Sequence, residues 1–152
     1  ARRVSRENAL DYVAGYTIAN DVTARELVER PDVSAMGMDW LACKSAPGFH
    51  ILGPYITPAQ FVADPQKLQI RLSLNGKVMQ DEGTDDMIFD VATLIEFTSK
   101  YIQLYPGDVI MTGSPSGNGT HYNRFLQDGD VMTGEIEGLI GQQVTRCEIE
   151  QA

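Results

Sequence analysis

The sequence has few of the residues that mark disulfide-rich, zinc-binding or membrane proteins. Two cysteines, Cys43 and Cys147, stand among 152 residues, too few for the disulfide framework of a small secreted domain. The only histidines are His50 and His121, too few for a histidine-rich zinc site. No apolar run approaches the ~20 residues that a membrane helix needs. These absences indicate a reducing, cytoplasmic setting and no membrane partner.

Positive charge is also scarce. Twelve Lys and Arg residues face 21 Asp and Glu residues, which gives a formal net charge of −9. Nucleic-acid binding relies on clustered basic side chains, and here they are scattered, so no nucleic-acid partner is expected. A chain of 152 residues with 43% hydrophobic residues has the size of one ordinary domain, and a single domain over 1–152 is expected.

The pattern of apolar residues predicts many strands and few helices. Ser5 is placed to cap a short helix to about Tyr12, and Asp90 to cap a longer one that ends before Pro106-Gly107. In the longer helix, the spacing predicts one buried stripe formed by Val91, Leu94, Ile95, Thr98 and Ile102.

The clearest strand signal is a hairpin. Alternating residues over 70–74 lead into Asn75-Gly76, a type I′ turn signal, and the chain returns over 78–80. Two Gly-Asp turns predict strands at 109–112 and 131–136, and a further strand is expected at 144–149. Short strands, frequent turns and few helices favour an α+β fold.

The most informative feature for function is where charge is missing. Asp21 is the only charged residue between Asp11 and Arg25, and Lys44 is the only formal charge between Asp39 and Asp64. An ionised group in apolar surroundings is costly unless it has a partner or a function. Together the two residues suggest a carboxylate and an ammonium that converge on one polar site. Taken singly, each has an ordinary alternative, a solvent-facing aspartate and a surface lysine.

Three further features have plain alternatives. The glycine-rich loop 112–119 follows a predicted strand and could point N–H groups at an anion, or be a wide surface turn. Cys43 beside Lys44 is interpreted as a small buried side chain rather than an activated thiol. Trp40 is interpreted as a core or interface anchor.

Three segments, 15–25, 44–54 and 106–115, together resemble the fumarylacetoacetate hydrolase family. They read GYTIANDVTAR, KSAPGFHILGP and PGDVIMTGSP, and the hairpin with Asp86 to Phe89 also matches. The resemblance covers nearly the whole chain. It implies the α+β mixed β-roll or β-sandwich of the family's C-terminal domain, and a homodimer. It also implies that the chain lacks the family's N-terminal part, with a Glu-x-Glu pair of metal ligands and the lid residues.

The resemblance assigns roles residue by residue. Asp21 matches a metal ligand for Mg²⁺ or Mn²⁺, and Lys44 matches the active-site lysine. Thr112, with Gly113 and Ser114, matches the segment that binds the substrate, and Arg25 matches an arginine placed to orient the metal carboxylates. Ser114 replaces a usual threonine, while Glu26 and Val28 replace a common aspartate and glutamine.

The implied chemistry is metal-dependent cleavage, hydration or isomerisation of small 2-oxo or β-diketo acids. Such an acid can chelate the metal through its carboxylate and keto oxygens, which stabilises an enolate. An oxaloacetate-type decarboxylase and a catalytically incomplete fragment that only binds small molecules stay open as alternatives. Glu135-Ile136-Glu137 has Glu-x-Glu spacing but is interpreted as ordinary strand sequence.

Overall fold

The computed structural model describes residues 1–33, 35 and 37–150, and the chain divides into two units. The larger unit contains residues 1–18 and the described residues from 54 onward, and the smaller one contains residues 19–53. Within the described residues, every strand pairing is antiparallel and helices are few, so the α+β class predicted from the sequence is confirmed. No helix in this part of the chain has the length and apolar character that crossing a membrane requires.

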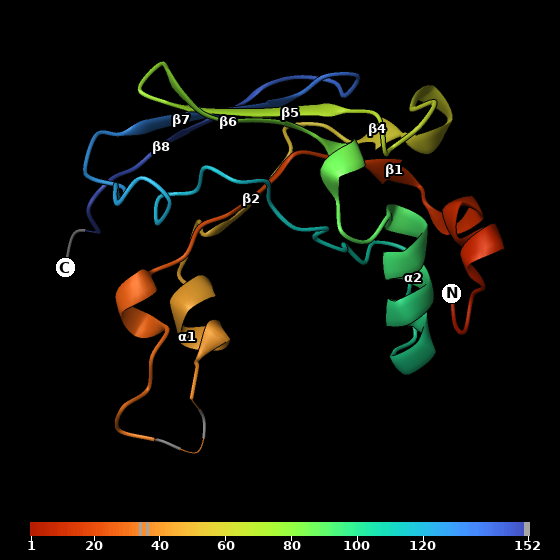
Figure 1. The fold of residues 1–152 in the computed structure, drawn as a ribbon, viewed down its shortest axis with the longest axis horizontal. Coiled ribbons are helices and arrows are strands. Elements are labelled where there is room, and N and C mark those ends of the chain that lie inside the picture. Colours follow the sequence, from red (N-terminus) through yellow and green to blue (C-terminus); the bar gives the residue numbers. More distant parts are fainter. Residues whose placement is uncertain (34, 36, 151–152) are drawn as a thin grey trace. The chain divides into compact units, whose positions relative to one another are not determined.

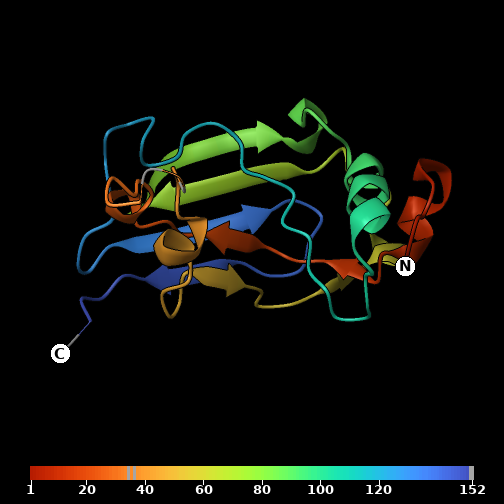
Figure 2. The ribbon, with the colours of Figure 1, turned by 90° about the horizontal axis from the view of Figure 1, so that it is seen from below.

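The larger unit contains a four-stranded antiparallel sheet (Figure 2). In spatial order its strands are β6 (Lys77–Gly83), β5 (Gln69–Leu74), β7 (Val131–Ile136) and β8 (Gln143–Arg146). Asn75 and Gly76 join β5 to β6 with φ of 51° and 80°. Positive φ at both central residues is the requirement of a type I′ turn, so the predicted hairpin is confirmed. Two further short strands, β1 (Gly15–Tyr16) and β4 (Thr57–Pro58), pair in the same unit.

Helix α2 (Val91–Tyr101) packs against the 3₁₀ helix η1 (Arg6–Tyr12) in the larger unit (Figure 1). Asp90 caps α2 as predicted, because its carboxylate accepts a hydrogen bond from the Thr93 N–H at 2.7 Å. Ser5 does precede η1, but its side chain makes no cap hydrogen bond. The apolar core here consists of four buried residues with partly buried neighbours, namely Val4, Ala9, Val91 and Ile95.

Three further local predictions are wrong in whole or in part. The strand expected at 144–149 is β8, which ends at Arg146. Ile102 lies one residue beyond α2 and is exposed, and Ser99 takes the buried position because its hydroxyl accepts a hydrogen bond from the Val4 N–H at 3.0 Å. Residues 109–112 form no strand. Their β-branched residues suit a strand, yet a strand also needs a neighbour to complete its hydrogen-bond ladder, and these residues have no such neighbour among those described.

The second Gly-Asp turn behaves as predicted and leads into β7. Asp130 is buried, and its carboxylate accepts hydrogen bonds at 2.8 Å from Asn75 Nδ2, Arg124 Nη2 and the Gln127 N–H. These contacts, led by the one from Asn75, hold the pKa of Asp130 below its ordinary value. The carboxylate therefore connects the β5–β6 turn with the start of β7.

The Asp130 network predicts acid sensitivity. A carboxyl group whose pKa is lower in the folded state stabilises fully above its unfolded pKa, about 3.8, and this stabilisation is lost as pH falls through the folded pKa. We expect Asp130→Asn to lower the free energy of unfolding at pH 7, and the difference from wild type to shrink between pH 5 and pH 3. Urea titrations across that range measure it. A difference that stays constant with pH would contradict the assignment.

The described residues of the smaller unit contain one pair of strands and two short helices (Figure 1). Strand β2 (Ala19–Asp21) pairs antiparallel with β3 (His50–Leu52). Between them in sequence come the 3₁₀ helix η2 (Arg25–Leu27) and helix α1 (Trp40–Lys44), which contact each other. The division of the chain into two units does not test the expected single domain over 1–152, which stays a prediction.

Candidate functional site

Asp21 is the last residue of β2, and the strand pairing fixes its backbone. It lies opposite His50 in the antiparallel register. The pairing continues past the strand end, because the Val22 N–H donates to the Phe49 carbonyl at 3.0 Å. The backbone on both sides of the carboxylate is therefore held by β3, while the side chain stays 34% exposed.

Lys44 is the last residue of helix α1. Asp39 caps the start of this helix by accepting from the Ala42 N–H at 2.8 Å. The helix end is tied to the segment that follows β2, because the Ala24 N–H donates to the Cys43 carbonyl at 2.9 Å. Cys43 is fully buried, as its interpretation as a small buried side chain predicts. These contacts bring the end of α1 next to the end of β2.

The two isolated charges of the sequence meet. Lys44 Nζ donates a hydrogen bond to Asp21 Oδ2 and forms an ion pair with it. The lysine side chain is only 25% exposed, so its ammonium is partly shielded from water. The predicted convergence of these two side chains, which are 23 residues apart, is confirmed. Their roles in chemistry stay predictions.

Two aromatic side chains border this pair, and the sequence patterns placed neither of them beside it. His50 Nε2 lies 3.5 Å from Asp21 Oδ1, whereas Lys44 contacts Oδ2. Only the β2–β3 register reveals this proximity, because no motif links the two residues. Trp40 is 48% exposed, so it is not a core residue, and its interpretation as an interface anchor stays a prediction. Its ring centroid lies 5.7 Å from Lys44 Nζ. At this separation the ring and the neighbouring ammonium are within cation–π range.

The donor set suits one coordination position of a hard divalent cation. Asp21 offers a carboxylate oxygen, the ligand type that Mg²⁺ and Mn²⁺ prefer. The described residues contain no group of three His, Cys, Asp or Glu side chains that could hold a metal ion. Glu135 lies in β7 and pairs with Arg71 at 3.7 Å, in agreement with its interpretation as strand sequence. Asp21 would hold a cation only together with other ligands.

Arg25 begins η2, in the same unit as Asp21 and Lys44. Its side chain is exposed and makes no hydrogen bond or ion pair with the described residues. The role assigned to it, orienting the metal carboxylates, therefore stays a prediction.

The predicted substrate-binding residues belong to the larger unit. Thr112 is exposed, and its hydroxyl makes no hydrogen bond with the described residues. Gly113 follows with φ of 110°, a conformation that disfavours any side chain. The Ser114 hydroxyl accepts a hydrogen bond from Gln80 Nε2 at 3.0 Å. Gln80 is a buried residue of β6, and the sequence patterns did not indicate its contact with Ser114.

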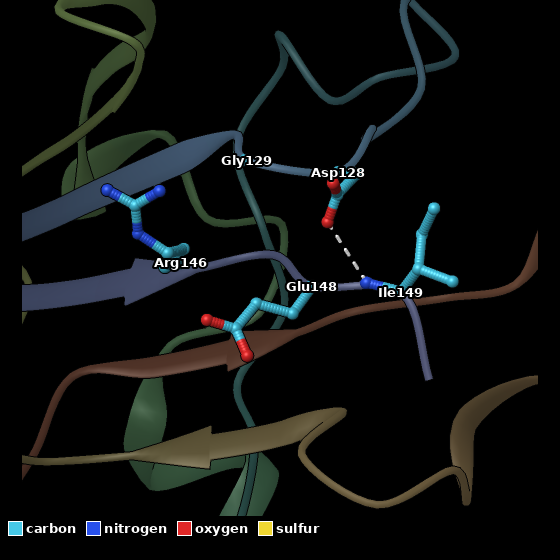
Figure 3. A pocket seen from close by; sticks show the side chains of 5 residues that line it. All are labelled: Asp128, Gly129, Arg146, Glu148 and Ile149. Atoms are coloured by element: carbon cyan, nitrogen blue, oxygen red, sulfur yellow. Dashed lines mark hydrogen bonds between the residues drawn. The ribbon is translucent and has the colours of Figure 1, made fainter. Parts of the chain in front are cut away.

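A separate hollow lies at the C-terminal end of the sheet (Figure 3). Its lining consists of Asp128, Gly129, Arg146, Glu148 and Ile149. The Asp128 carboxylate accepts a hydrogen bond from the Ile149 N–H at 3.1 Å, as the figure shows. None of the residues predicted to bind metal or substrate or to act in catalysis lines it. The hollow is open and mixed in charge, and the site candidates lie elsewhere.

Comparison with known proteins identifies the family. The model of the fumarylacetoacetate hydrolase C-terminal region matches residues 1–147. The chain belongs to this family. A 2,4-didehydro-3-deoxy-L-rhamnonate hydrolase of Sphingomonas sp. is 42% identical over 141 residues, which cover 91% of this chain and 48% of that protein. A mitochondrial oxaloacetate tautomerase of Xenopus laevis is 38% identical over 140 residues, which cover 91% of this chain and 43% of the relative.

A solved structure confirms that the fold is that of the family. A fumarylpyruvate hydrolase from Pseudomonas aeruginosa, in complex with Mn²⁺ and pyruvate, has a TM-score of 0.84 and 30% identity to this chain. The match covers 98% of this chain and 60% of that one. The chain thus spans about half the length of the curated relatives that it matches.

Proposed function

We propose that this chain is the metal-binding portion of an enzyme that acts on small 2-oxo or β-diketo acids with Mg²⁺ or Mn²⁺. The observation that carries the proposal is the contact between Lys44 and Asp21, two isolated charges that residues 19–53 bring together. Relatives that act as a hydrolase and as an oxaloacetate tautomerase support the substrate class. The solved relative in complex with Mn²⁺ and pyruvate supports the cofactor.

In this proposal each residue has one task. Asp21 holds the divalent cation, which supplies Lewis-acid stabilisation of negative charge on the substrate's carboxylate and keto oxygens. Lys44 donates hydrogen bonds to an oxygen that gains charge, and its partial shielding from water strengthens that interaction. Thr112, Gly113 and Ser114 hold the substrate carboxylate or carbonyl, and Arg25 orients the metal ligands.

C–C hydrolysis, hydration, isomerisation and decarboxylation all pass through a stabilised enolate, so the same residues would serve each of them. The oxaloacetate tautomerase among the relatives makes oxaloacetate the first substrate to test. A homodimeric assembly and a cytoplasmic location, both expected from the sequence, are part of this proposal.

The test uses the full-length protein, stripped of metal with EDTA and then reloaded with Mg²⁺ or Mn²⁺. Acylpyruvates, oxaloacetate and 2-oxo-alkenedioates are supplied in turn, and turnover is followed by the absorbance of the enol or diketo form. We expect turnover of at least one class that disappears with EDTA and returns with the metal. Activity that survives EDTA would favour a binding or catalytic mode without metal. No turnover or binding of any of the three classes would overturn the proposal.

A further inference from the structure

The glycine-rich loop 112–119 is held against two adjacent residues of strand β6, Met79 and Gln80. Tyr122, just beyond the loop, donates its hydroxyl hydrogen to the Met79 carbonyl at 3.1 Å. Gly117 lies so close that an added Cβ would be 2.0 Å from the same carbonyl oxygen, so any side chain there would clash with backbone. Both contacts therefore hold the loop against the Met79 carbonyl, although the loop contains no regular secondary structure.

Gln80 is the side chain that engages the loop directly. It is only 7% exposed, and its Nε2 donates to Ser114 Oγ at 3.0 Å and to the Pro115 carbonyl at 2.8 Å. An amide nitrogen carries two hydrogens, so both are used within this loop. A buried amide with both donors satisfied has little freedom to rotate. Ser114 Oγ is therefore held at a defined place.

The Gln80 contact also determines how Ser114 can bind a ligand. A hydroxyl oxygen that accepts a hydrogen bond keeps its own hydrogen for donation elsewhere. The other polar contact of this hydroxyl with the described residues is the Pro115 carbonyl at 3.4 Å, a separation too long for a strong bond. The exposed Ser114 hydroxyl is thus prepared to donate to an acceptor that comes from solution.

We propose that Gln80 is a positioning residue, which makes Ser114 Oγ a fixed hydrogen-bond donor to a carboxylate or keto oxygen of the substrate. This inference rests on the proposed function, because it takes Ser114 as a substrate contact. It extends that function, because Gln80, a residue outside the loop, would make the site select ligands that carry an anionic or carbonyl acceptor. The neutral amide is suited to this task, because a carboxylate at position 80 would accept the hydroxyl hydrogen and repel an anionic ligand.

The experiment is a double-mutant cycle on the full-length, Mn²⁺-loaded protein, with pyruvate as the probe. Calorimetry gives the Kd for wild type, Gln80→Met, Ser114→Ala and the double variant. We expect each single substitution to weaken pyruvate binding about tenfold, and the double variant to be no weaker than either single one, since both remove the same oriented donor. For the substrate found in the activity screen, KM should rise with kcat little changed.

Two controls make the result specific. Gln103→Met removes an exposed amide outside the loop, and pyruvate binding should stay at the wild-type level. Ser114 is exposed, so Ser114→Ala should fold even if Gln80→Met does not, and it tests the donor by itself.

Wild-type affinity in Ser114→Ala, or a hundredfold additive loss in the double variant, would overturn the inference and leave the proposed function standing. If the wild-type protein bound neither pyruvate nor any 2-oxo acid of the screen, both would fail.

Discussion

Replacing Lys44 by methionine is expected to lower turnover of the 2-oxo acid substrate roughly 100- to 1,000-fold, the usual cost of removing a preorganised donor to a charged transition state. Methionine keeps much of the volume beside Trp40 but loses the ammonium that contacts Asp21. Steady-state kinetics of the full-length protein with saturating Mn²⁺ measure the effect. Affinity for Mn²⁺ should stay the same or increase, because a positive charge next to the proposed ligand has been removed.

Lys67→Met is the matched control for this substitution. Lys67 also pairs with an aspartate, Asp64 at 3.0 Å, but its side chain is 79% exposed. Exposed ion pairs contribute little to stability, because water and salt screen them, so neither turnover nor folding should change noticeably. Wild-type turnover in Lys44→Met would refute the catalytic role of Lys44.

Replacing Asp21 by asparagine is expected to raise the Kd for Mn²⁺ roughly 100-fold or more. Losing an outer partner of a metal ligand typically costs 10- to 100-fold in affinity, and a direct ligand should cost at least as much. Asparagine keeps the shape of the side chain at the end of β2, so the pairing with β3 should persist. Titration of the metal-free protein with Mn²⁺, followed by calorimetry or by the EPR signal of free Mn²⁺, gives the Kd directly.

Asp32→Asn is the control in the same unit. Asp32 pairs with Arg30 at 2.8 Å and is 63% exposed, and it lies outside the Asp21–Lys44 contact. We expect its affinity for Mn²⁺ to equal that of wild type. Undiminished Mn²⁺ binding by Asp21→Asn would remove Asp21 from the set of metal ligands.

The two substitutions separate binding from catalysis. Lys44→Met should lose turnover and keep the metal, whereas Asp21→Asn should lose the metal and, with it, turnover. If the Asp21–Lys44 contact were only a structural ion pair, both variants would show the same small loss of stability and neither pattern would appear.

Local patterns predicted those parts of the fold that depend on a few adjacent residues. The Asn75-Gly76 turn follows from backbone conformations that these residue types adopt readily, and the Asp90 cap from a side chain that reaches the Thr93 N–H. The strand expected at 109–112 did not form. The residues of a segment indicate its strand propensity, but they do not indicate whether another strand lies beside it. Ser99 was missed as a buried residue because its burial depends on the distant Val4 N–H.

The candidate site, like the fold, could be predicted from the sequence only in part. The sequence by itself determined which charges are unusual, because a lone Asp21 and a lone Lys44 in uncharged stretches need no structure to be noticed, and the family motifs assign them roles. Only the tertiary structure decided that the two side chains touch, that His50 faces the same carboxylate, and that Gln80 holds Ser114. Each of these contacts joins residues from different elements, and strand register and helix packing, rather than local preference, set the distances between them.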